Sequence, residues 1–229
     1  FDRDYLDEAR RYYTNIVGKY GPQVQAVLKK AETLDIQMLL PLHGFVWREE
    51  LGYLLGKYDL WSRYEPEVRG VMIAYASVYG GTENAANVLA CRLAEQGVQV
   101  KMFDVSVTPA PYVVSDAFKY SHLVFASATY NMGIFVTMED LLHDIAAHAL
   151  ADRRYALIEN GTWSPASGKK MDALLSPLKG WSAVEPVLTV KSALRPDQAA
   201  QMQRLADAIA ADVKAEQTEE DASGEGKHR

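Results

Sequence analysis

The chain has 229 residues, 48% of them hydrophobic and 24% charged, with a formal net charge of −6 at pH 7. This length and apolar content are enough for a buried core, and we expect one domain plus part of a second. The negative charge excludes a basic surface for nucleic acid, and no apolar run approaches the roughly 20 residues that span a bilayer. A single cysteine, Cys91, and the lack of an apolar leader indicate a reducing, cytoplasmic location.

The first part of the chain predicts a small, mostly helical unit. Its expected elements are a helix over 6–20 that Gly21-Pro22 stops, a helix over 24–34, a strand over 36–40, a helix over 51–58 and a linker over 61–67. This unit has too little sheet to be a complete domain, so we expect residues 1–66 to be part of one. Because the chain begins at Phe1 without a methionine, we expect a fragment or processed form of a longer protein.

From Val68 onward, strand-like and helix-like stretches alternate, which predicts an α/β domain over residues 67–215 with a doubly wound, five-stranded parallel sheet. The expected strands are 70–76, 98–103, 122–127, 155–159 and 183–190, and the expected helices are 83–95, 137–150, 166–178 and 196–214. Residues 216–229 are polar and predict a disordered tail.

A turn rich in glycine and hydroxyl groups, from Ser77 to Thr82, follows the first strand of this domain and opens a helix. A turn in this position directs backbone N–H groups and the positive end of the helix dipole at an anion. It contains no lysine or arginine and matches neither the G-x-x-x-x-G-K-[ST] nor the G-x-G-x-x-G pattern. The turn therefore predicts a site for one phosphate monoester, held by amide and hydroxyl groups.

Two further loops carry large aromatic residues, and parallel topology brings them to the same sheet edge as the phosphate turn. Tyr130 follows the third expected strand and Trp163 the fourth, each close to glycine. One phosphate and a planar ring with a polar edge describe flavin mononucleotide (FMN). The expected FMN site comprises Ser77, Val78, Tyr79, Gly80, Gly81, Thr82, Ala128, Thr129, Tyr130, Asn131, Gly133, Asn160, Gly161, Thr162 and Trp163. We expect amides of the Asn160-Gly161-Thr162 turn to meet the flavin ring edge.

These three loops, read as Ser-x-Tyr-Gly-x-Thr, Thr-Tyr-Asn-x-Gly and Glu-Asn-Gly-Thr-Trp, resemble the flavodoxin domain of the flavodiiron proteins. Upstream, Pro41-Leu42-His43-Gly44 and Tyr58-Asp59-x-Trp61 resemble the end of that family's metallo-β-lactamase-like domain. The resemblance implies an FMN module that passes electrons from a rubredoxin-like donor to a diiron centre, which reduces O2 to water or NO to N2O. It also implies a head-to-tail homodimer of the full-length protein.

The chain departs from the family at two places. Only His43 resembles one of the family's iron ligands, and a single imidazole cannot assemble a two-iron site, so the diiron centre is expected only in a full-length protein. Gly81 stands where the family usually has asparagine, which removes one expected hydrogen bond to FMN.

Other interpretations stay open from the sequence. A stand-alone, NAD(P)H-dependent FMN or quinone reductase would use the same flavin site, and a flavin-free interaction domain would use none. Tyr130 and Trp163 could instead be packing aromatics. In the helix expected over 137–150, His143 and His148 do not share a face, so we expect no metal there and a surface pair between Glu139 and His143. Cys91 is expected to be a buried or boundary thiol.

Overall fold

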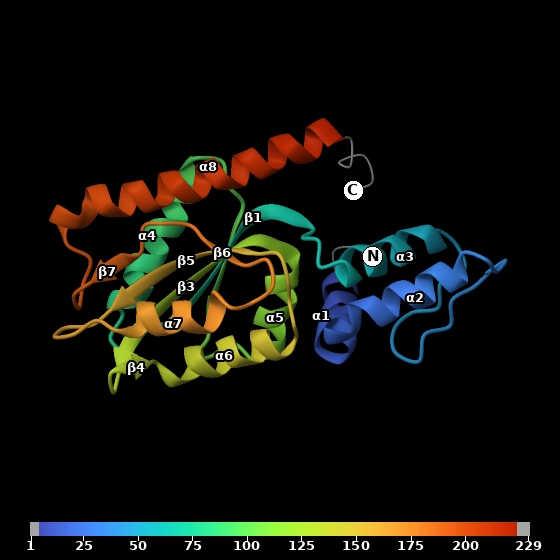
Figure 1. Ribbon diagram of the computed structural model, residues 1–229, viewed down its shortest axis with the longest axis horizontal. Coiled ribbons are helices and arrows are strands. Elements are labelled where there is room, and N and C mark those ends of the chain that lie inside the picture. Colours follow the sequence, from blue (N-terminus) through green and yellow to red (C-terminus); the bar gives the residue numbers. More distant parts are fainter. Residues whose placement is uncertain (1–4, 224–229) are drawn as a thin grey trace.

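The structure is a computed structural model that describes residues 5–223, and its centre is a mainly parallel sheet (Figure 1). The strands are β1 (Val68–Ala76), β2 (Val100–Asp104), β3 (Tyr120–Tyr130), β4 (Gly133–Ile134), β5 (Arg154–Asn160), β6 (Ser182–Ala183) and β7 (Leu188–Val190). Their order is β2-β1-β3-β5, with β6 and β7 both pairing with β5 and β4 returning antiparallel on β3. This is the flavodoxin-like order, so the predicted doubly wound sheet is confirmed.

The fifth position of the sheet is divided between two short strands, where the sequence predicted one strand over 183–190. β6 ends at Ala183 and β7 begins at Leu188. Pro186 lies between them, and proline has no N–H group to donate to a neighbouring strand. The chain therefore stops pairing with β5 after Ala183 and pairs with it again from Leu188 to Val190.

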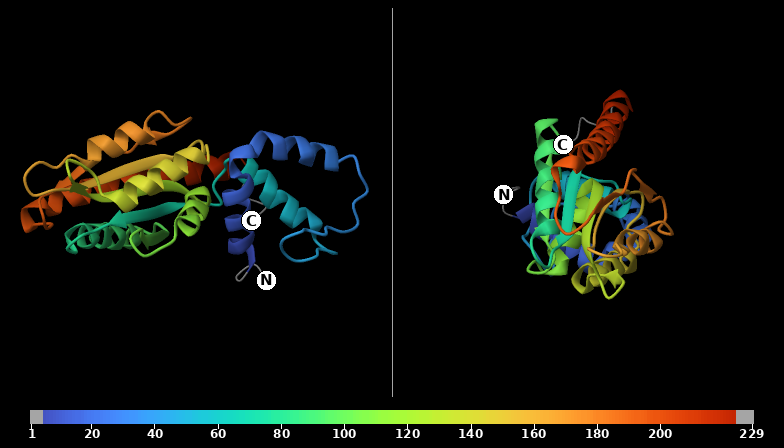
Figure 2. Two further views of the ribbon diagram at one scale, coloured as in Figure 1. Left: turned by 90° about the horizontal axis from the view of Figure 1, so that it is seen from below. Right: turned by 90° about the vertical axis from the view of Figure 1, so that its left-hand side faces the viewer.

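Helices cover both faces of the sheet (Figure 2). They are α4 (Gly81–Glu95), α5 (Ala110–Lys119), α6 (Val136–Ala147), α7 (Ser167–Leu175) and α8 (Ala199–Ser223), the last preceded by the 3-10 turn η3 (Pro196–Gln198). The sequence reading missed α5, which begins just after Pro109 and has Pro111 in its first turn, where a missing N–H group costs nothing.

The polar segment at the end of α8 is helical as far as Ser223, so the tail predicted over 216–229 is wrong for that part, and residues 224–229 lie outside the described ones. Two contacts with β1 explain the longer helix. The Gln217 side chain donates to the Arg69 carbonyl (2.9 Å), and Glu216 lies 3.9 Å from the Arg69 guanidinium.

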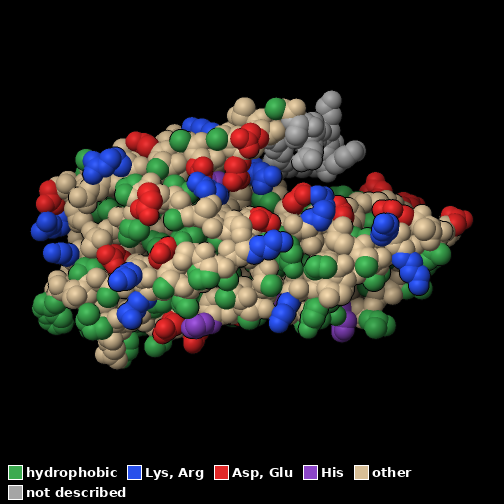
Figure 3. Space-filling view, viewed as in Figure 1, with side chains coloured by type: hydrophobic (Ala, Val, Ile, Leu, Met, Phe, Trp, Pro, Cys, Tyr) green, Lys and Arg blue, Asp and Glu red, His purple; other side chains and the backbone are tan. Residues whose placement is uncertain are grey.

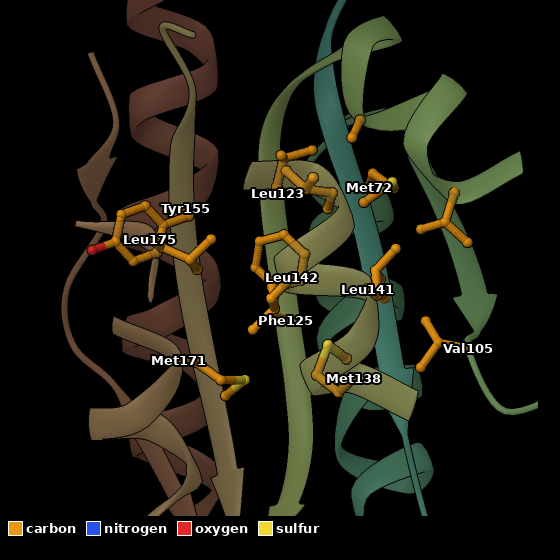
Figure 4. Packing of buried hydrophobic residues seen from close by; sticks show 14 of the residues in the cluster. Met72, Val105, Leu123, Phe125, Met138, Leu141, Leu142, Tyr155, Met171 and Leu175 are labelled. Carbon is orange, nitrogen blue, oxygen red and sulfur yellow. The ribbon is translucent and has the colours of Figure 1, made fainter. Parts of the chain in front are cut away.

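The sheet separates two hydrophobic cores. On one side Met72, Leu123 and Phe125 pack against α5, α6 and α7 through residues such as Met138 and Leu142 (Figure 4). The opposite face of the sheet packs against α4 and α8, which contact each other. Since side chains alternate across a strand, residues of β1 and β3 contribute to both cores, and these central strands are apolar almost throughout.

The N-terminal helical unit lies at the end of the sheet where the parallel strands begin, opposite their carboxyl ends (Figure 1). It comprises α1 (Asp7–Val17), η2 (Gly18–Tyr20), α2 (Gly21–Ala31) and α3 (Leu51–Ser62). The strand predicted over 36–40 is wrong, because only a single bridge joins Leu39 to Trp47. The predicted linker is also shorter, since Trp61 belongs to α3 and is fully buried with Tyr13.

Two buried arginines fix this unit to the sheet domain. Arg10 of α1 donates to the Ser115 carbonyl (3.3 Å) and pairs with Glu67 (3.1 Å) and Asp116 (3.4 Å). Arg153, directly before β5, is only 1% exposed and donates to five backbone carbonyls, including those of Tyr64 (2.6 Å) and Phe118 (2.7 Å). The connection between the two parts is therefore an ordered interface rather than a loose tether.

We predict that Arg153→Met lowers the free energy of unfolding by about 3 kcal/mol or more, because several buried carbonyls would lose their donor together. Urea denaturation followed by circular dichroism measures this loss. Arg195→Met is the matched control, since its pair with Asp197 is 64% and 66% exposed and is expected to contribute about 1 kcal/mol or less. Equal losses in the two variants would contradict the assigned role of Arg153.

A second polar cluster anchors α8 to the beginning of β3. His122 is 2% exposed, lies 2.8 Å from the Ser121 hydroxyl and 3.1 Å from an Asp212 carboxylate oxygen, and Asp212 also pairs with Arg154. Burial lowers the pKa of His122 to about 4, an effect that the hydrogen bond to the Asp212 carboxylate opposes and the charges of Arg154 and Arg69 reinforce. The folded protein therefore keeps this imidazole neutral.

The depressed pKa predicts a pH dependence of stability. Unfolded histidine titrates near 6.5, so the contribution of His122 is complete above that pH and is lost as the pH falls towards 4. The free energy of unfolding should fall by about 3 kcal/mol more in wild type than in His122→Gln over this interval. Urea titrations at several pH values test this, with His143→Gln, at an exposed position, as the control. Parallel profiles for wild type and His122→Gln would contradict it.

Candidate functional site

The turn between β1 and α4 has the geometry of an anion cradle. Gly80 caps α4 with a positive φ of 84° and no side-chain cap, and the first helical bond runs from Asn84 N–H to the Gly80 carbonyl. The preceding N–H groups, at the first positions of the helix, have no acceptor within it. Ser77 Oγ accepts from Gly80 N–H (3.1 Å), which fixes the turn and leaves its hydroxyl proton for a ligand. Thr82, 2% exposed, lies at the base of the turn.

Large aromatic side chains stand exposed on three loops at this edge. Tyr79 is 98% exposed, Trp163 95% and Tyr130 47%, and Val78 next to the first is also exposed. Single exposed apolar residues are ordinary, but three aromatic residues on converging loops form a surface suited to a flat ring. Figure 3 shows hydrophobic side chains at the end of the molecule formed by the β4 turn and the loop after β5.

The second predicted loop is a tight hairpin. β3 and β4 pair through Thr129 with Ile134 and Tyr130 with Gly133. The two residues between them, Asn131 and Met132, both have positive φ (47° and 58°), as a two-residue hairpin of this kind requires. The hairpin holds Tyr130 at the rim, edge-on to Phe135.

Thr129 has a structural task at this edge. Its Oγ1 accepts from Ala166 N–H (3.0 Å) and Ser167 N–H (3.2 Å), so it caps α7 from a neighbouring strand. Ala128, before it, pairs in register with Asn160. Glu159 adds a second cap by accepting from Gly168 N–H (3.0 Å). The N-terminus of α7 is thus satisfied by the protein itself.

The third predicted loop uses its polar groups inside the protein more than the sequence suggested. Gly161 N–H donates to the Val190 carbonyl (3.1 Å), so the expectation that this amide is free for a flavin ring is wrong. A side chain at Gly161 would come within 3.1 Å of Thr129 Oγ1, which shows how closely the second and third loops approach. Thr162 Oγ1 lies 2.8 Å from Ser192 Oγ.

A fourth loop, residues 191–195 after β7, also belongs to this site and was missed from the sequence. Asn160, 7% exposed, joins it to the phosphate turn: Nδ2 donates to the Ser192 carbonyl (3.0 Å) and to Thr82 Oγ1 (3.2 Å), and Oδ1 accepts from Ser192 N–H (2.9 Å). No local motif marks residues 191–195, so only the pairing of β7 with β5 reveals their position.

Gly81 has a packing reason to lack a side chain. A Cβ at this position would lie 1.9 Å from the Ser192 carbonyl oxygen, which real Cβ atoms do not tolerate. From the sequence alone, Gly81 was expected to remove one hydrogen bond to FMN. The structure gives it another role, since it lets the fourth loop rest directly on the phosphate turn.

The other candidate residues lie elsewhere. His43 is in the helical unit, between α2 and α3, where its ring lies 5.0 Å from that of Tyr12. On α6, His148 lies 3.4 Å from Asp144, whereas the sequence suggested a pair of Glu139 with His143. Within residues 5–223, no three histidine, cysteine or acidic side chains are grouped to hold a metal ion. Cys91 is exposed rather than buried.

Comparison with known proteins agrees with this geometry. The flavodoxin family model matches residues 73–206, more than half of the chain. The chain belongs to the flavodoxin family. Its solved structural neighbours include rubredoxin oxygen:oxidoreductase of Desulfovibrio gigas (TM-score 0.83, 24% identity, 90% of this chain and 52% of that one). The flavodiiron protein of Giardia intestinalis is similar as well (TM-score 0.83, 21% identity, 92% and 53%).

Curated relatives extend the likeness beyond the flavodoxin region. A nitric oxide reductase of Moorella thermoacetica is 25% identical over 210 residues, which are 91% of this chain and 52% of the relative. An anaerobic nitric oxide reductase flavorubredoxin of Aeromonas hydrophila is 25% identical over 199 residues, 85% and 39% respectively. The predicted resemblance to flavodiiron proteins is therefore confirmed over most of the chain, which spans about half or less of these relatives.

FMN is the cofactor that this family membership supports, and the residues present fit it. Ser77 and Thr82 each retain a hydroxyl proton, the start of α4 offers free N–H groups, and exposed rings of Tyr79 and Trp163 lie on neighbouring loops.

The described helices include none with the length and apolar character needed to cross a bilayer. On the face drawn in Figure 3, acidic and basic side chains are interspersed.

Proposed function

We propose that this chain is the FMN-binding electron-transfer module of a flavodiiron oxidoreductase. The observation that carries the proposal is the joint arrangement of a cation-free phosphate turn and exposed aromatic side chains at one sheet edge. When bound, FMN supplies one- and two-electron chemistry. The chain binds its phosphate at the Ser77 to Thr82 turn, and Tyr79, Tyr130 and Trp163 flank the ring.

The finer proposal concerns the electrons. A rubredoxin-like protein reduces the flavin, and a diiron site in the full-length protein receives the electrons and reduces O2 to water or NO to N2O. The names of the relatives, nitric oxide reductase and rubredoxin oxygen:oxidoreductase, support both partners of this transfer. A cytoplasmic location is part of the same proposal.

The position of the helical unit bears on where the electrons go. We assign residues 1–66 to the end of a metallo-β-lactamase-like domain and His43 to one ligand of its metal site. This unit lies at the opposite end of the sheet from the phosphate turn (Figure 1). Because electron transfer needs close approach of the two centres, a head-to-tail homodimer that sets one flavin beside the partner's iron site is part of the proposal.

Flavin binding tests the proposal first. The purified chain should be yellow and release FMN on denaturation, and Ser77→Ala and Thr82→Ala should each weaken FMN binding by about 1 kcal/mol or more, because each removes a donor to a charged group. Fluorescence titration of the apoprotein with FMN gives both affinities. Ser106→Ala, a serine on the loop after β2, is the matched control. A colourless protein with no affinity for FMN would refute the proposal.

Electron donation tests the finer part. Reduced rubredoxin should reduce the bound flavin rapidly, whereas NAD(P)H alone should not, because the electrons are proposed to arrive through a protein donor. Stopped-flow absorbance at the flavin band follows both reactions. Steady NAD(P)H oxidation by the chain on its own would instead favour a stand-alone flavin or quinone reductase.

A further inference from the structure

The segment over residues 191–195 contacts the phosphate turn although the two are about 110 residues apart in the chain. The contact is close, because the Ser192 carbonyl oxygen occupies the space where a side chain at position 81 would stand. A carbonyl oxygen beside an anion-binding turn is unfavourable unless its lone pairs are satisfied. Asn160 Nδ2 satisfies this one, at 3.0 Å.

The orientation of the Asn160 amide is fixed by the protein. Backbone N–H groups only donate, so the side-chain atom facing Ser192 N–H at 2.9 Å must be the oxygen. The nitrogen then faces the Ser192 carbonyl and Thr82 Oγ1. Both amide protons are used within the protein, and no donor of this side chain is left for a flavin ring.

This arrangement also sets the polarity of Thr82. Its hydroxyl oxygen accepts from Asn160, so its own proton is the group available to an anion. A hydrogen bond received by a hydroxyl also strengthens the one that it gives. Asn160 thus fixes Thr82 as a hydrogen-bond donor, and its two hydrogen bonds to the Ser192 backbone hold the loop over residues 191–195 in place.

The backbone of Ser192 is constrained at this contact. Its φ is +67°, a left-handed conformation that is strained for residues other than glycine. Such strain persists where the surroundings fix it, and here Asn160 binds both the N–H and the carbonyl of the same residue.

We infer that Asn160 is a positioning residue for the phosphate turn, acting through Thr82 and the Ser192 backbone, and not a contact of the flavin ring. This inference rests on the proposed function, since it assigns a role within the FMN site. It separates the roles of the third loop: Trp163 is left for the ring, whereas Asn160 serves the phosphate.

A comparison of two ligands tests the inference. FMN and riboflavin share the ring and differ in the phosphate, so Asn160→Ala should weaken FMN by about tenfold while riboflavin changes by about twofold or less. In a Thr82→Ala background, Asn160→Ala should have a much smaller effect on FMN, because the residue through which it acts is already gone. Flavin fluorescence titration of the apoproteins gives every affinity.

Two further variants accompany this comparison. Asn15→Ala removes an amide that joins α1 to the Pro111 carbonyl (3.1 Å), far from the site, and reports general loss of stability. If Asn160→Ala does not fold, Gly81→Ala displaces the Ser192 carbonyl instead and should show the same selective loss.

Each other outcome overturns the inference or the proposed function separately. Equal weakening of FMN and riboflavin would mean that Asn160 contacts the ring, and unchanged FMN affinity would mean that it positions nothing. Fully additive effects with Thr82→Ala would exclude action through that hydroxyl. A wild-type chain that binds neither ligand would refute the proposed function itself.

Discussion

The constraint on which the rest of the site depends is the termination of parallel strands at a single sheet edge. β1, β3, β5 and β7 all end there, and the loops after β1, β5 and β7 leave the hydrogen-bonded ladder. Those groups need partners from side chains or a ligand. Thr129, Glu159 and Asn160 supply many of them by reaching across from the ends of β3 and β5. At the start of α4, by contrast, no side chain caps the helix.

Local patterns were enough to predict the doubly wound parallel sheet and the turn between β1 and α4, because apolar strands and a glycine-rich turn are each formed by adjacent residues. Features that depend on distant contacts were not predicted. The fourth loop reaches Gly81 only because β7 pairs with the last residues of β5, and Thr129 caps a helix that begins 38 residues later. Likewise, α8 continued past the expected end because Gln217 finds a carbonyl on β1. Sequence shows which groups are available, but not which of them the fold already uses.

In the helical unit, too, the contacts made in the fold differ from what the local sequence indicates. Residues 36–40 are apolar enough for a strand but have only one bridging partner, at Trp47, so no ladder forms. Arg10 and Arg153 were unremarkable in the sequence, yet both are buried at the interface with the sheet domain. Arg153 donates to the Tyr64 carbonyl of the connecting segment, and Arg10 of α1 binds Ser115 and Asp116 of α5, so both side chains join the two parts. The unit is thereby held away from the flavin edge, which is why transfer within a single chain is disfavoured in our proposal.

Binding an anion in a protein of net charge −6 without a lysine or arginine in the turn demands a particular kind of site. Neutral donors attract a phosphate less strongly than a cation does at a distance, so their contribution depends on being aligned before the ligand arrives. A freely rotating hydroxyl would spend part of its time with its oxygen lone pairs facing the phosphate, and this repulsion would weaken binding. The hydrogen bonds that Asn160 makes with Thr82 and with the Ser192 backbone remove that freedom. They do so at the position where Gly81 lets a second loop stiffen the turn from outside. Rigidity supplied by hydrogen bonds thus takes the place that a basic side chain has in other phosphate sites.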